Sequence, residues 1–205
     1  MGITRNLWLA LLSMVCITIL GCDAQRQAAA TGKAAGKTSP QGQMSYNIVE
    51  RDAFTVMGTL ARVTTAQEND ETYAEIWKKF EPYDAQMKPI SIDRRYYGVD
   101  FATGQKGVMD YLAGMMVPDE ATPLDKQLVV RKVPAARYAV FPCTAQTIGQ
   151  MYQYIFNQWL PSSRYEINTA ACSFEQYAPK EWRNRPVFIC IPVNKKEATS
   201  AGSGK

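Results

Sequence analysis

The sequence contains no histidine among its 205 residues. This absence excludes a Ser-His-Asp triad, a Cys-His pair and any zinc site with an imidazole ligand. The five cysteines show no C-x-x-C spacing, so the usual thiolate metal centres are not indicated either. We therefore expect neither a bound metal nor a cofactor, and any chemistry would rely on carboxylates, hydroxyls and aromatic rings.

A strong excess of basic residues is also missing. Lys and Arg number 23 against 19 Asp and Glu, which gives a net charge of +4. The basic residues are scattered along the chain and several lie near its ends, so no dense basic surface for nucleic acid is indicated. With 46% hydrophobic residues, the chain has enough apolar side chains for a sizeable core. We expect no nucleic-acid partner.

The first 22 residues have the features of a secretory signal. One charge, Arg5, precedes an apolar run from Leu7 to Leu20. The run is several residues shorter than the roughly 20 that span a membrane comfortably as a helix. Its end, Ile19-Leu20-Gly21-Cys22, resembles the lipobox of bacterial lipoproteins. By this resemblance, residues 1–21 are removed and Cys22 becomes acylated; an ordinary signal peptide followed by a chance cysteine is the alternative.

Acylation would place the protein on a membrane. Several acyl chains, each contributing about 0.8 kcal/mol per buried CH₂, hold a protein stably on a bilayer. We therefore expect a lipid-anchored protein in the bacterial cell envelope, on its extracytoplasmic side. Asp23 follows the acylated cysteine, and by resemblance to enteric lipoprotein sorting it favours the inner membrane. Residues 22–45 and 194–205 have a low-complexity, polar composition, which predicts a flexible linker and a disordered tail.

Residues 46–193 remain as one domain, and they contain a repeated pattern. The first apolar stripe consists of Tyr73, Ile76, Trp77 and Phe80, at the i, i+3, i+4, i+7 spacing of an amphipathic helix. A second stripe with the same spacing and similar residues begins at Tyr152, an offset of 79 residues. The two stripes predict helices near 70–81 and 146–160.

The same offset brings the segments around the two helices into rough register. Phe54 to Arg62 precedes the first helix, as Ala135 to Cys143 precedes the second. Each half is therefore predicted to run strand, helix, strand, strand. Two such units predict an α+β domain with one curved antiparallel sheet and both helices on one face. The alternative to duplication is a chance similarity between two amphipathic helices.

Glu175 is the most informative single residue of the domain. It lies in Ser173-Phe174-Glu175-Gln176-Tyr177-Ala178, which alternates like a half-buried strand and stands between an apolar helix and an apolar strand. A carboxylate buried there costs several kcal/mol unless a partner compensates for it. Successive strand residues point to opposite faces, so we expect Glu175 and Tyr177 on one face, with Phe174 and Gln176 on the other.

Aromatic residues around Glu175 are the predicted walls of a groove. The candidates are Tyr97, Tyr111, Tyr138, Tyr177 and Trp159. Each of these rings would also suit ordinary core packing. Because an aromatic face attracts a cation by about 0.5–2 kcal/mol, such a groove with one carboxylate would select positive ligands over neutral ones.

Four segments follow one another in the order of a known family. They are Val133 to Phe141, Trp159 to Glu166, Phe174 to Tyr177 and Ile189 to Val193. In this order they resemble the GyrI-like small-molecule-binding domain, which is also the effector-binding domain of AraC- and MerR-type regulators. The likeness covers about residues 46–193.

This resemblance implies a fold and a type of ligand. It implies the duplicated strand-helix-strand-strand fold and a groove between the halves for lipophilic, often cationic compounds, with an acid at the place of Glu175. Two features depart from the family. Cys143-Thr144-Ala145 stands where members often have histidine and glycine, so we expect a different loop. A linker rather than a helix-turn-helix precedes the domain, so we do not expect a transcription regulator of the usual kind.

Three functions remain open from the sequence. The leading one is a membrane-anchored module that binds lipophilic or cationic small molecules at Glu175. The second is a small hydrolase in which Glu175 acts as general base, or as nucleophile on a strained electrophile. The third is a structural or protein-interaction role, in which the groove is filled and Glu175 pairs with Arg95 or Arg137.

The lipid anchor gives the first testable prediction. Cys22→Ala removes the sulfur and so is expected to abolish acylation and membrane attachment, measured by incorporation of labelled palmitate and by membrane fractionation. Palmitate incorporation in the variant equal to that in the wild type would show that this segment is an ordinary signal peptide.

Overall fold

The computed structural model describes residues 44–64, 66–67, 70–179 and 185–197. The predicted signal peptide, Cys22 with its predicted acylation, and nearly all of the predicted linker lie outside the described residues. Within the described part of the chain, no helix is long and apolar enough to cross a membrane.

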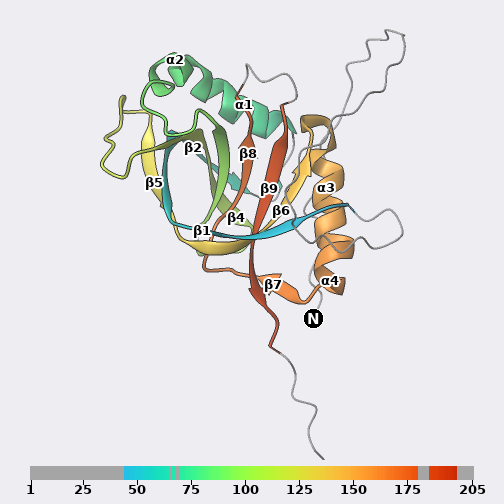
Figure 1. The fold of residues 1–205 in the computed structure, drawn as a ribbon. Helices are drawn as coiled ribbons and strands as arrows, with labels where there is room; N and C mark the ends of the chain where they lie inside the picture. Colours follow the sequence, from blue (N-terminus) through green and yellow to red (C-terminus); the bar gives the residue numbers. More distant parts are fainter. Residues whose placement is uncertain (1–43, 65, 68–69, 180–184, 198–205) are drawn as a thin grey trace, which may run out of the picture.

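The described residues form two successive units of similar composition (Figure 1). The first consists of β1 (Asn47–Arg51), β2 (Phe54–Thr64), α1 (Asp70–Phe80), η1 (Glu81–Tyr83), α2 (Asp84–Met87), β3 (Tyr96–Ala102) and β4 (Val108–Val117). The second consists of β5 (Val129–Val133), β6 (Ala136–Cys143), η2 (Ala145–Thr147), α3 (Ile148–Tyr154), the π-helical η3 (Ile155–Trp159), α4 (Leu160–Ser162), β7 (Tyr165–Ile167), β8 (Ser173–Tyr177) and β9 (Val187–Lys195). The predicted strand-helix-strand-strand order is confirmed in both halves. Each half has one additional strand in front, and the second half has the short β7 between its helix and β8.

All strands belong to one nine-stranded antiparallel arrangement. Its order is β1-β6-β9-β8-β3-β4-β2-β5, and β7 pairs with β9 off this path. The additional strand of each half extends the sheet of the other half, because β1 pairs with β6 and β5 pairs with β2. The two halves meet in the middle, where β3 pairs with β8.

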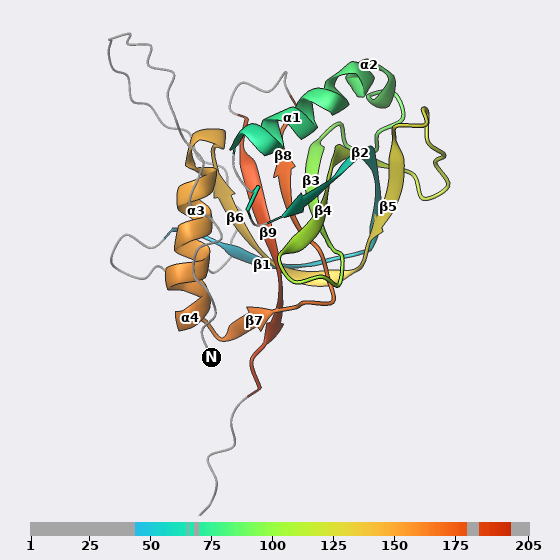
Figure 2. The ribbon, with the colours of Figure 1, turned by 180° about the vertical axis from the view of Figure 1, so that it is seen from behind.

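The connection between β1 and β2 makes the sheet curl. Only Asp52 and Ala53 separate the two strands in the sequence, yet β1 lies at one end of the strand order and β2 lies next to the other end. The sheet must bend until these ends approach, and Figures 1 and 2 show β1 crossing from the α3 side toward β5. The predicted curved sheet is therefore confirmed, and its curvature follows from a short linker.

Both helices lie on one face of the sheet, as predicted. Ile76 and Phe80 of α1 pack into one core cluster with Met57 and Met115 of the sheet. On the other half, Ile155 and Trp159 pack with strand residues of β6 and β9. A third cluster fills the face turned away from the helices and includes the fully buried Phe174, Tyr97 and Tyr138. Burying each large apolar side chain contributes about 1.5–3 kcal/mol.

The offset of 79 residues holds in the helices and in the central strands β3 and β8, where Tyr97 and Gln176 pair directly and lie on the same face, but it fails in other strands. Ile76 and Ile155 are both buried under their helices. Tyr111, however, lies on the helix face, whereas Cys190, 79 residues later, belongs to the opposite face. The expected register is therefore confirmed for β3 and β8 and needs a correction for β4 and β9. A shift of the pairing by an odd number of residues turns every side chain of a strand to the other face. A difference of one residue between the loops of the two halves is therefore enough to break the repeat in a strand.

Candidate ligand-binding site

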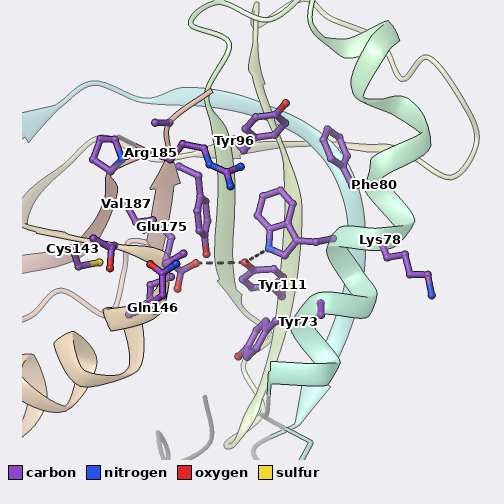
Figure 3. A pocket seen from close by; sticks show the side chains of 18 of the residues that line it. Tyr73, Lys78, Phe80, Tyr96, Tyr111, Cys143, Gln146, Glu175, Arg185 and Val187 are labelled. Atoms are coloured by element: carbon purple, nitrogen blue, oxygen red, sulfur yellow. Dashed lines mark hydrogen bonds between the residues drawn. The ribbon is translucent and has the colours of Figure 1, made fainter. Parts of the chain in front are cut away.

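A cavity of about 1040 Å³ opens between α1 and the beginning of α3, over the middle strands of the sheet (Figure 3). Its walls are mainly aromatic and aliphatic. They include Tyr73, Trp77, Phe80, Tyr96, Tyr111, Cys143, Ile148, Tyr152, Glu175, Tyr177, Arg185 and Val187. This volume suits a drug-sized ligand, since such pockets measure about 300–1,000 Å³.

Glu175 lies in this cavity with only 7% of its surface exposed. The Tyr152 hydroxyl donates a hydrogen bond to Oε1 of Glu175. The Tyr111 hydroxyl lies 3.5 Å from Oε2, and Nε1 of Trp77 donates to the Tyr111 oxygen at 3.2 Å (Figure 3). Residues from α1, β4 and α3 thus converge on one carboxylate, and through it they join the two halves.

The alternation of side chains along β8 places the Glu175 side chain on the face that carries the helices. Phe174 belongs to the opposite core, and Gln176 donates to the Tyr97 hydroxyl at 2.8 Å on that side. Across the β3–β8 pair, Glu175 faces Gly98. A Cβ on Gly98 would lie 2.0 Å from the Tyr111 hydroxyl oxygen and 2.8 Å from Oε2 of Glu175. The missing side chain therefore leaves the space in which Tyr111 approaches the acid.

Burial in these apolar surroundings raises the pKa of Glu175 to about 8. The negative charge of Asp100 raises this pKa further, and the hydrogen bonds from Tyr152 and Tyr111 oppose the shift. Asp100 itself accepts a hydrogen bond from the Ser173 hydroxyl at 2.9 Å, and burial raises the pKa of Asp100 to about 6. Glu175 is thus a carboxyl group that is protonated over much of the neutral range.

Glu175 has no basic partner among the described residues. The two arginines that a purely structural role would use are engaged elsewhere. Arg137 pairs with Glu50 in the neighbouring strand β1, its Nε donating at 2.6 Å. Arg95 lies 3.9 Å from Asp93. The expected internal arginine partner is therefore not found beside Glu175 in the described residues.

The rings around the carboxylate meet mostly edge to face. Tyr73 and Tyr111 have ring centroids 4.8 Å apart, and those of Trp77 and Tyr177 lie 5.4 Å apart. Edge-to-face pairs contribute about 0.5–1.5 kcal/mol beyond their buried area, so they hold the walls in place. Rings fixed in this way offer their faces and edges to a ligand without further ordering.

The structure brings three of the six predicted binding residues into the cavity: Glu175, Tyr177 and Tyr111. It places the other three elsewhere. Tyr97 and Tyr138 point to the face away from the helices, because they alternate with cavity-facing positions of their strands. Trp159 lies at the far end of the second helix, where it packs against Phe141 with ring centroids 4.9 Å apart. These three side chains do not line the cavity and instead fill the cores on either side of the sheet.

The helix stripes identify Tyr152 and Trp77 only as apolar positions, whereas both side chains line the cavity. Their polar atoms were the available signal, since a hydroxyl or an indole N–H inside an apolar stripe needs a partner. Gly98 is a weaker signal. A glycine inside a strand indicates that another group approaches the backbone closely, but it does not identify that group.

Other chemistry is limited in the described part of the chain. It contains no cluster of acidic and cysteine side chains that would hold a metal ion. Cys143, Cys172 and Cys190 are free thiols rather than a disulfide pair. Cys143 lines the cavity, but burial raises the pKa of its thiol to about 12, so it is not a reactive thiolate.

Comparison with known proteins gives a family. A family model described as Cass2, integron-associated effector binding protein, matches residues 47–193, well over half of the chain. A search of curated proteins finds no match. The family match marks the described domain as one that binds small-molecule effectors.

Solved structures share the fold at low sequence identity. SAV2435 bound to tetraphenylphosphonium has a TM-score of 0.60 at 17% identity, covering 74% of this chain and 94% of that chain. An integron cassette protein of Vibrio cholerae has a TM-score of 0.55 at 24% identity, covering 73% and 95%. A putative transcription regulation protein of Staphylococcus aureus has a TM-score of 0.55 at 16% identity, covering 74% and 99%.

Gly98 provides a test of the site geometry. Gly98→Ala places a methyl group against the Tyr111 oxygen, and Tyr111 is buried among rings that leave it little room to move. We expect a loss of about 1–3 kcal/mol in the free energy of unfolding, measured by urea denaturation. Adding Tyr111→Phe, which deletes that oxygen, is expected to restore part of the loss. A double variant no more stable than Gly98→Ala would argue against this contact.

The pKa of Glu175 gives a pH-dependent prediction. An unfolded glutamate ionises near pH 4.3, whereas folded Glu175 keeps its proton to about pH 8. Between these values the folded state holds one more proton, so its stability falls as the pH rises. We expect the wild type to lose a few kcal/mol relative to Glu175→Gln between about pH 5 and pH 9. A difference that stays constant or reverses would indicate a buried cationic partner.

Proposed function

Because this chain belongs to the Cass2 family of integron-associated effector binding proteins, we propose that it binds lipophilic cations in the cavity over Glu175. The observation that carries the proposal is the carboxylate itself. It is 7% exposed, it is surrounded by aromatic walls, and no basic residue among those described neutralises it. A ligand with a positive charge would supply the missing partner.

The electrostatics favour a cation over a neutral ligand. At an effective dielectric constant near 20, two opposite charges about 4 Å apart attract by roughly 4 kcal/mol before desolvation is subtracted. A cation in the cavity would also lower the pKa of Glu175, since a nearby opposite charge favours the ionised form. The two tyrosine hydroxyls already donate to the carboxylate and would stabilise its charged state.

The relatives support the same class of ligand. SAV2435, which shares this fold, was solved with tetraphenylphosphonium, a lipophilic cation with four aromatic rings. The cavity here suits such a ligand, because Tyr73, Trp77, Tyr96 and Tyr177 line it together with the buried acid Glu175. Aromatic faces add about 0.5–2 kcal/mol for each cation contact.

We further propose that the domain works at a membrane surface. The support is the lipobox-like Ile19-Leu20-Gly21-Cys22 and the polar segment that follows it. A tether of about 22 residues gives a flexible reach of roughly 25 Å. Anchored in this way on the extracytoplasmic side, the cavity would meet lipophilic compounds where they partition into the bilayer.

Glu175→Gln tests the proposal, because it keeps the shape of the side chain and removes its charge. Calorimetry with methyltriphenylphosphonium is expected to show a loss of about 1–3 kcal/mol in binding free energy. The neutral triphenylphosphine oxide is expected to bind the two proteins alike. Glu81→Gln is the matched control, since Glu81 also lines the cavity but is exposed, and it should change cation affinity little.

The alternatives predict other outcomes. If Glu175 is a catalytic base, the wild type should open strained epoxides, and Glu175→Gln should stop turnover while leaving binding largely intact. If the role is structural, the wild type should bind neither compound and Glu175→Gln should melt at a lower temperature. Failure of the wild type to bind any lipophilic cation would overturn the proposed function.

A further inference from the structure

The cavity also carries a basic group at its mouth that forms no ion pair with the described residues. Two basic residues line it, Lys78 and Arg185. Nζ of Lys78 lies 3.5 Å from Glu75 on the outer side of α1, and Figure 3 shows the ammonium pointing away from the cavity. The guanidinium of Arg185 is directed into the cavity in the same view. Among the described residues, no carboxylate lies within ion-pairing distance of Arg185.

The other acids of the cavity do not neutralise Arg185. Asp84 accepts a hydrogen bond from the Tyr96 hydroxyl at 2.6 Å and lies 3.3 Å from Nζ of Lys88. Glu81 is exposed at the rim and forms no ion pair among the described residues. The cavity therefore presents a carboxyl group at Glu175, deep in the wall, a guanidinium at Arg185, near the opening, and the exposed carboxylate of Glu81 at the rim.

We propose that this cavity is suited to an amphoteric aromatic ligand, whose cation reaches Glu175 while a carboxylate or similar anionic group meets Arg185 at the mouth. The inference rests on the proposed function, because it concerns the second end of the same ligand. It changes the expected class from simple lipophilic cations to aromatic compounds with one charge of each sign.

The physical reason is the sign of the interaction at the mouth. Arg185 repels a ligand that carries only positive charge, so a simple cation loses part of what it gains at Glu175. An anionic group on the same ligand turns this repulsion into attraction. The planar guanidinium can donate two parallel hydrogen bonds to a carboxylate, which fixes its direction as well as its charge. The aromatic body between the two groups would pack against the ring of Trp77.

A matched pair of dyes tests the inference. Rhodamine B carries a xanthylium cation and a carboxylate, and its ethyl ester has the same ring system without the negative charge. We expect the wild type at about pH 8, near the pKa of Glu175, to bind the acid about 2- to 5-fold more tightly than the ester, measured by calorimetry. The absorbance of the xanthylium band shows that the bound acid is in its open, charged form.

Charge reversal at the mouth makes the test sharper. In Arg185→Glu the preference is expected to reverse, with the ester bound more tightly than the acid. Lys79→Glu is the matched control, because it makes the same change in net charge at an exposed residue of α1 that does not line the cavity. That variant should keep the preference of the wild type within a factor of about 2.

The possible failures are distinguishable. If the ester binds at least as tightly as the acid in the wild type, the amphoteric ligand is wrong and the cation site stands. If Arg185→Glu prefers the acid over the ester by the same factor as the wild type, Arg185 is not the group that contacts the anion. If neither dye nor any simple cation binds, the proposed function itself fails.

Discussion

The site depends on a buried carboxyl group that has no basic partner among the described residues. Glu175 is held by hydroxyls from both halves of the domain, Tyr111 on β4 and Tyr152 on α3. These hydrogen bonds offset only part of the cost of burial, which is why the pKa of Glu175 stays high, at about 8. A well-packed hydrophobic residue would serve stability better at this position. This arrangement agrees with the proposed site, in which a cationic ligand supplies the charge that balances ionised Glu175.

The duplicated fold places this group where two halves meet. The β3–β8 pair forms the junction, and the cavity over it lies between α1 of one half and the beginning of α3 of the other. Gly98, opposite Glu175, keeps that space open for the Tyr111 hydroxyl. The cavity thus results from joining two units. Its walls come from residues at the edges of the two core clusters that lie under α1 and α3.

Sequence periodicity predicted the elements well, because helix stripes and strand alternation depend on local geometry. The stripes beginning at Tyr73 and Tyr152 gave both helices, and alternation around Glu175 gave the correct face of β8. The face of Tyr97 and the place of Trp159 depended on register and on curvature, which arise from pairing over long distances. Arg185 offered no periodic signal, since its position follows from a connection rather than from an element.

Exchange of a proton for a ligand charge sets the selectivity of such a site. Below about pH 8 the empty cavity holds a neutral carboxylic acid, which costs little in apolar surroundings. A cation must displace that proton to gain the full attraction, whereas a neutral compound leaves it in place. Net cation affinity is therefore the Coulomb attraction reduced by the free energy of ionising Glu175. An anionic group that meets Arg185 adds attraction without this penalty, because that contact displaces no proton from Glu175.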